Sequence, residues 1–133
     1  MKNTFKKLIF LMPFIVASCS EAQETEFEKK MNKSADSYLL ILEKLAKFSE
    51  THKEKDLTEG QKIWILQHNC VMHKNIVSHM EFLMANVEEY NKTYNFHETK
   101  ESIAESSVEH AESYIEYLNE LASKGKKCEI SDI

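Results

Sequence analysis

Residues 58–90 decide the fold and read TEGQKIWILQHNCVMHKNIVSHMEFLMANVEEY. Thr58 followed by Gln61 fits a capping box, in which each side chain accepts a hydrogen bond from the other residue's backbone N–H, so a helix should begin here. Apolar side chains then recur every three or four residues, which is the spacing of one face of an α-helix. The members of this face are Ile63, Leu66, Cys70, His73, Val77, Met80, Met84 and Val87. The helix should end near Tyr90.

Three further apolar residues form a second line on the opposite face of this helix, namely Trp64, Val71 and Phe82. A helix that is apolar on two sides is usually buried on both of them. We therefore expect this helix to be the central one of its domain. The alternative is that the face with Trp64 and Phe82 binds a partner.

Two more helices flank this segment. A capping box from Thr25 to Glu28 predicts the start of the first, and the polar run 51–56 ends it. Its apolar face consists of Phe27, Met31, Ala35, Tyr38, Leu42, Leu45 and Ser49. After the polar loop 91–93, Asn95 with Glu98 can cap a third helix, which Gly125 and its neighbouring lysines should terminate. The face of the third helix consists of Ala104, Val108, Ala111, Ile115, Leu118 and Ala122.

The composition fits a folded helical domain. Of 133 residues, 42% are hydrophobic and 29% are charged, and the chain has one proline and two glycines. Long stretches therefore lack backbone breakers, which favours long helices. Consecutive amphipathic helices with short connections pack against their neighbours in sequence. We predict an all-α fold, an antiparallel three-helix bundle over residues 25–133.

The first residues have the layout of an export signal, because three lysines precede the apolar run 8–17. This run is too short for a transmembrane helix, which needs about 20 apolar residues. The motif Val16-Ala17-Ser18-Cys19 resembles the lipobox of bacterial lipoproteins. The resemblance implies that residues 1–18 are a signal peptide that is removed. It also implies that Cys19 carries diacylglycerol and an acylated amino group, and that residues 19–24 tether the domain to a membrane.

The residue after the lipidated cysteine bears on the location. Ser20 stands there, and in the enterobacterial sorting pattern that this resembles, the absence of aspartate implies the outer membrane. The alternative is cleavage after Ala22, which would release a soluble protein. The five residues from Ser20 to Glu24 reach at most about 17 Å. The domain should therefore work close to its membrane, outside the cytoplasm.

The charge argues against nucleic acid as a partner. All 17 basic residues are lysines, and removal of the three in residues 1–18 leaves 14 lysines against 22 acidic residues, a net charge of −8. A chain without arginine lacks the planar group that pairs bidentately with phosphate, and a negative surface repels nucleic acid.

Cys70 and Cys128 remain in the mature chain besides the lipidated cysteine. Outside the cytoplasm two thiols tend to oxidise, so a disulfide between them is one prediction. If the second and third helices pair around a turn near Thr93, Cys70 lies opposite approximately Asn119, so Cys128 must fold back past Gly125 to reach it. The alternative is a buried thiol at position 70 and a free cysteine on the C-terminal tail.

Soft and borderline metal ligands gather in the central segment, where His68, Cys70, His73, His79 and Met80 follow one another. Such ligands suit copper or zinc. Cys70 and His73 lie one turn apart, and a proposed pairing of the helices would bring His110 near His79. The competing hypothesis makes His73 a hydrogen-bonded core residue, makes Met80 a packing residue and leaves His68, His79 and His110 in solvent.

The third helix carries an acidic stripe at spacings of three and four residues. Its members are Glu98, Glu101, Glu105, Glu109, Glu112, Glu116 and Glu120. Like charges at these spacings repel each other by a few tenths of a kcal/mol per pair. The stripe is either a solvated face or a docking surface for a basic partner, with Glu105, Glu109, Glu112 and Glu116 at its centre.

No motif for a nucleophile, a phosphate loop or a zinc protease occurs in the chain, so we expect no enzyme activity and no cofactor. The leading hypothesis is a membrane-tethered protein interaction module of the cell envelope, acting in immunity, exclusion or envelope assembly. The alternative is a lipoprotein that binds copper or zinc through Cys70, His73 and Met80, or through His79 and His110. A purely structural spacer is a third possibility.

Overall fold

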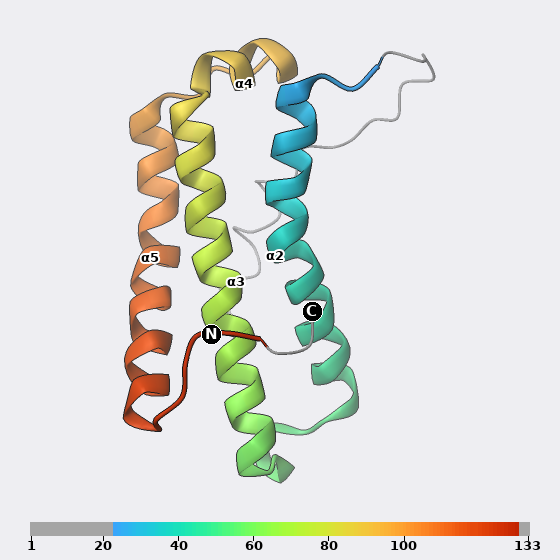
Figure 1. Ribbon diagram of the computed structural model, residues 1–133, viewed down its shortest axis with the longest axis vertical. Helices are drawn as coiled ribbons and strands as arrows, with labels where there is room; N and C mark the ends of the chain where they lie inside the picture. The colour runs from blue at the N-terminus through green and yellow to red at the C-terminus, as the bar shows by residue number, and fades with distance from the viewer. Residues whose placement is uncertain (1–22, 131–133) are drawn as a thin grey trace.

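The computed structural model describes residues 23–130, and every regular element in this range is a helix (Figure 1). The four α-helices are α2 (Glu26–Thr51), α3 (Glu59–Ala85), α4 (Val87–Tyr94) and α5 (Lys100–Ser123), and a short 3-10 helix, η2, covers Glu54–Asp56. The predicted all-α class is therefore confirmed. The predicted signal peptide, the lipobox and Cys19 lie outside the described residues.

α3 is the central helix, as its two apolar faces predict. It packs against α2 on one side and against α5 on the other, and both neighbours run antiparallel to it (Figure 1). The predicted three-helix bundle is not confirmed, because four α-helices are present and the three long ones lie side by side in a row. Within residues 23–130, none of the helices combines the length and the hydropathy that crossing a membrane requires.

Two capping boxes begin α2 and α3 at the predicted residues. The backbone N–H of Thr25 donates to Glu28 at 2.7 Å, and the N–H of Glu28 donates to the Thr25 hydroxyl at 3.1 Å. Thr58 and Gln61 exchange the same pair of bonds at 2.9 and 3.3 Å. Both boxes satisfy backbone donors that the first turn of a helix leaves without a partner.

The start of the third long helix differs from the prediction. Asn95 does not open it but ends α4, in the left-handed conformation with φ 55° that asparagine tolerates better than most residues. Thr99 caps α5 instead, in a capping box with Ser102. The central helix likewise ends at Ala85, earlier than the predicted end near Tyr90, and α4 follows it as a separate short helix.

The chain after α5 folds back across α3. Gly125 adopts φ 65°, and the backbone N–H of Lys126 donates to the carbonyl of Leu121 at 2.9 Å, which closes the helix and reverses the chain. Residues 126–130, here called the C-terminal strap, then cross in front of α3 (Figure 1). Cys128 forms a disulfide with Cys70 of α3. Of the two alternatives that the sequence left open, a disulfide or two free cysteines, the structure therefore has the disulfide.

The core lies between α3 and its neighbours. Its buried apolar members come from α2, α3, α4 and α5, and Ile130 of the strap packs against them. They are Met31, Ala35, Tyr38, Ile41, Met72, Ile76, Met80, Leu83, Tyr90 and Ile103. The methionines fill irregular space in this core, which their flexible side chains allow.

Candidate interaction surface

The face of α5 that packs on α3 is not the predicted one. Ile103, His110 and Leu121 are buried against the core. Val108, Ile115 and Leu118, which belong to the predicted apolar face, are 52%, 57% and 38% exposed. The helix is therefore rotated by about 100°, or one residue, from the predicted orientation.

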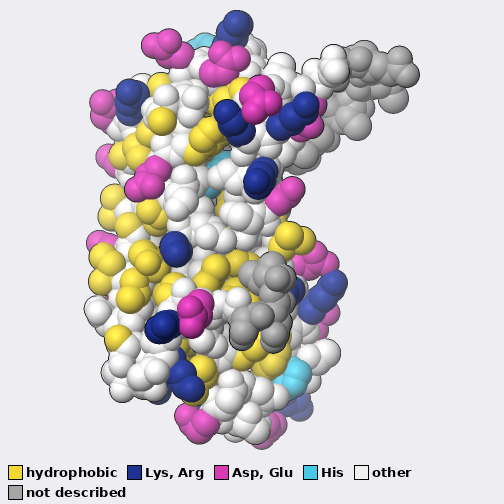
Figure 2. All heavy atoms as spheres, in the orientation of Figure 1, with side chains coloured by type: hydrophobic (Ala, Val, Ile, Leu, Met, Phe, Trp, Pro, Cys, Tyr) yellow, Lys and Arg dark blue, Asp and Glu magenta, His cyan; other side chains and the backbone are white. Residues whose placement is uncertain are grey.

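This rotation leaves a line of apolar side chains in solvent, which we call the α5 stripe. It consists of the exposed Val108, Ile115 and Leu118, with the half-buried Ala104 and Ala111 and the exposed Ala122 between and beyond them. Figure 2 shows hydrophobic side chains gathered along the α5 edge of the same face that the C-terminal strap crosses. Single exposed apolar residues are ordinary, whereas several along one face of a helix are typical of a binding surface.

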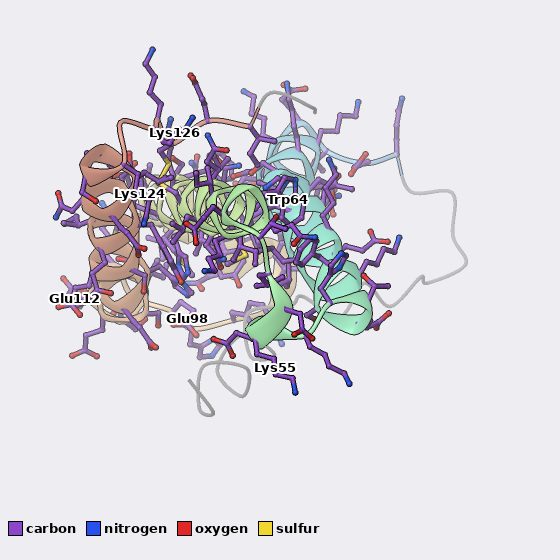
Figure 3. All side chains as sticks on the ribbon, turned by 90° about the horizontal axis from the view of Figure 1, so that it is seen from below. Lys55, Trp64, Glu98, Glu112, Lys124 and Lys126 are labelled. Carbon is purple, nitrogen blue, oxygen red and sulfur yellow. A yellow bond between two sulfur atoms is a disulfide. The ribbon has the colours of Figure 1, made fainter. Side chains whose placement is uncertain are left out.

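The glutamates of the predicted acidic stripe are all exposed, and we call them the glutamate row. Its members are Glu98, Glu101, Glu105, Glu109, Glu112, Glu116 and Glu120. Figure 3 shows Glu112 on the outer side of α5, away from α3. The row therefore runs along the stripe on the side opposite to the helix contact.

The charge of the row is not balanced by the ion pairs that the structure gives for the described residues. These join Glu26 to Lys30, Glu43 to Lys47 and Glu59 to Lys62, and none of the three includes a glutamate of the row. Between residues 101 and 123 the sequence contains six glutamates and no lysine. The cost of placing like charges three or four residues apart is therefore not relieved within α5.

The predicted partner face with Trp64 and Phe82 is an internal contact. Trp64 stacks on Phe48 of α2 with ring centroids 4.8 Å apart, and Phe82 stacks on Phe27 of α2 at 5.7 Å. Figure 3 shows Trp64 between α3 and α2. The second apolar line of α3 thus packs on α2 and its side chains are half-buried, so partner binding through it is not supported.

The candidate metal ligands do not converge on one point. Cys70 is held in the disulfide, Met80 is buried in the core and His79 faces α2, where its Nδ1 lies 3.1 Å from the hydroxyl of Ser34. The predicted proximity of His79 and His110 is therefore wrong. His110 instead faces His73, and their Nδ1 atoms are 3.0 Å apart.

The histidines predicted to be solvated are buried. His68, His79 and His110 are all less than a tenth exposed. His68 stacks on Trp64, and its Nδ1 lies 2.8 Å from the carbonyl of Trp64 one turn earlier. Each of these three rings thus packs within the helix contacts rather than standing in water.

Burial also determines the protonation state of His73, His79 and His110. Burial, together with the nearby His110, lowers the pKa of His73 to about 4. Burial alone lowers the pKa of His79 to about 4 and lowers the pKa of His110 as well. All three are therefore neutral at physiological pH, and they are hydrogen-bonding core groups.

A pair of imidazoles is a poor metal site by itself, because structural zinc takes four protein ligands and catalytic zinc takes three. Within residues 23–130, no group of three or more His, Cys, Asp or Glu side chains is placed to hold an ion. What the arrangement offers to another molecule is the exposed stripe and the row beside it.

Compared with known proteins, the chain matches no protein-family model, no curated protein and no solved structure.

Proposed function

We propose that this chain is a lipid-anchored, non-catalytic interaction module of the bacterial cell envelope, which binds a partner protein through the exposed face of α5. The single observation that carries the proposal is the line of large apolar side chains that α5 leaves in solvent beside its row of glutamates. In this proposal α2, α3 and α5 act as one antiparallel three-helix unit, with α4 as a connection.

The disulfide supports the exported location. Disulfides form and persist in oxidising compartments and are rare in the cytosol, and Cys70 is joined to Cys128 here. The anchor itself rests on the motif around Cys19, which is short but follows directly on a charged start and an apolar run. Outer-membrane attachment is the form of the proposal that Ser20 favours.

Attachment can be tested by replacing the acylated residue. In cells fed with labelled palmitate, the chain should incorporate label and sediment with membranes, because several acyl chains give stable anchoring. Cys19→Ala should lose the label and accumulate in its unprocessed form. Incorporation of label into C19A, or a soluble wild-type chain, would contradict the anchor.

Partner binding can be tested by photocrosslinking in intact cells. A photoreactive amino acid at position 115 should give a discrete crosslinked band, because Ile115 lies at the centre of the stripe. Leu40 of α2 is the matched control, since it and Ile115 have the same exposed fraction of 57%. Equal crosslinking at both positions, or none at position 115, would contradict the proposal.

The metal alternative has less support. It requires Cys70 as a thiolate or His79 close to His110, and neither arrangement is present. His73 and His110 alone supply two of the protein ligands that such a site needs.

A further inference from the structure

We propose that the partner presents a basic amphipathic helix, which lies along α5 with its apolar side on the α5 stripe and its lysines or arginines against those members of the glutamate row that border the stripe. This inference rests on the proposed function and deepens it, because it names the chemistry of the segment that binds. The evidence is the combination of spacing, charge and available length on one helix.

The spacing of the stripe suits a helix. Val108, Ile115 and Leu118 follow each other at intervals of seven and three residues, which is the pattern of anchors that helix-in-groove contacts use. On α5 the α3 contact borders one side of the stripe and the glutamate row borders the other. A helix placed there would bury its own apolar line between the two.

The charge selects a basic partner. Glu105 and Glu112 stand three residues before Val108 and Ile115, so at about 100° per residue they border the stripe directly. Glu109 and Glu120 point about 130° or more away from its centre. Cations on the partner would pair with the first two and relieve the repulsion along α5.

The same charge disfavours two other occupants. In an antiparallel contact between two copies through α5, the two glutamate rows would lie beside each other and repel, and in a parallel contact neither row would meet a lysine within residues 101–123. An anionic membrane surface would also repel them, because it attracts lysine and arginine rather than carboxylate. Self-association through α5, or binding of α5 to an anionic membrane, would therefore contradict the proposal.

The length of the site sets the size of the partner segment. From Val108 to Leu118 the stripe extends about 15 Å, and from Ala104 to Ala122 about 27 Å. Lys124 and Lys126 lie where α5 ends and the C-terminal strap begins (Figure 3). A helix of about 18 residues would cover the stripe from Ala104 to Ala122.

The experiment uses the intact chain and three synthetic peptides of about 18 residues. The first has leucines at heptad spacing with lysines along one edge of the apolar line. The second has the same composition in scrambled order, and the third carries glutamate in place of lysine. Fluorescence anisotropy measures their binding at low salt and at about 0.15 M salt.

The first peptide should bind at least about tenfold more tightly than the scrambled one, and the acidic peptide should not bind. Glu105→Lys with Glu112→Lys should weaken this binding by about tenfold or more, whereas Glu109→Lys with Glu120→Lys, which changes the net charge equally, should weaken it less than about threefold. Ile115→Glu should abolish it, whereas Leu40→Glu should not.

Several outcomes would overturn the inference. They are equal binding of the scrambled peptide, equal loss in the two double variants, and stripe-dependent self-association or vesicle binding without peptide binding. The crosslink at position 115 separates this failure from failure of the proposed function. If a partner is crosslinked through a segment that is neither basic nor amphipathic, only this inference is contradicted. If no partner is crosslinked, the proposed function is contradicted.

Discussion

The Nδ1 atoms of His73 and His110 lie 3.0 Å apart across the contact between α3 and α5. One nitrogen must carry the proton and donate, and the other must accept, so the pair holds only while at least one ring is neutral. Tyr117 stacks on His73 with ring centroids 5.6 Å apart, which keeps the pair in an apolar setting. This contact and the one between His79 and Ser34 place neutral histidines on both sides of α3.

Acid should therefore unfold this domain through its histidines. The ordinary histidine pKa of 6.5 applies to the unfolded chain, whereas the folded pKa of His73 and of His79 is about 4. Because the unfolded state binds more protons between these values, the contribution of the two histidines to stability should be constant above about pH 7 and fall as the pH decreases from about 6.5 towards 4. Each of the two histidines contributes on the order of 2 kcal/mol to this loss. Urea unfolding at a series of pH values measures it.

A variant isolates the contribution of one ring. His79→Gln keeps a polar group that can face Ser34 but removes the titration. The slope of unfolding free energy against pH should therefore decrease by up to about 1.4 kcal/mol per pH unit near pH 5. A wild-type stability that stayed level down to about pH 4.5 would contradict the buried neutral rings.

The disulfide should contribute strongly to stability. It closes a loop with a sequence separation of 58 residues. In the chain-entropy description, such a loop stabilises the folded state by about 4 kcal/mol. Cys70→Ala with Cys128→Ala should lower the unfolding free energy by about 2–4 kcal/mol, and so should reduction of the wild-type chain with dithiothreitol.

A control separates the bond from the packing of the strap. Dithiothreitol should leave the double variant unchanged, because it has no disulfide between these positions to lose. If reduced and oxidised wild-type chains unfolded at the same urea concentration, the strap would not be the constraint described here.

The helix starts that are determined by residues close together in the sequence were predictable. A capping box needs only two side chains three positions apart, and those at Thr25 and Thr58 occur as predicted. The central position of α3 was also predictable, because both of its sides are apolar. Local patterns determine these features, so one sequence is enough to find them.

The pairing of α3 with α5 was not predictable in the same way. It depends on the connection between them, where Asn95 ends α4 and Thr99 opens α5. The prediction brought His110 to His79, whereas the structure brings it to His73, six residues earlier in the chain. A small error in where a helix begins therefore changes every contact across the helix pair.

The candidate site was found only in part. The glutamates were identified as a possible docking surface, but the apolar line beside them was assigned to the core. The buried face of α5 contains His110 and Tyr117, which look more polar than the exposed valine, isoleucine and leucine. Periodicity selects the more apolar face, whereas the packing uses the face whose rings meet those of α3.

The orientation of α5 can be tested by comparing two isoleucines of the same helix. Ile103 is 5% exposed and Ile115 is 57% exposed. Ile103→Ala should therefore lower the unfolding free energy by about 2–5 kcal/mol, because it leaves a cavity in the core. Ile115→Ala should change it by less than about 0.5 kcal/mol, since the side chain already stands in water. Urea unfolding of the two variants measures both changes in unfolding free energy. If Ile115→Ala were the more destabilising of the two, the face that periodicity favours would be the buried one. The expected order, combined with the crosslink from position 115, would separate the residues that stabilise the fold from those that contact the partner.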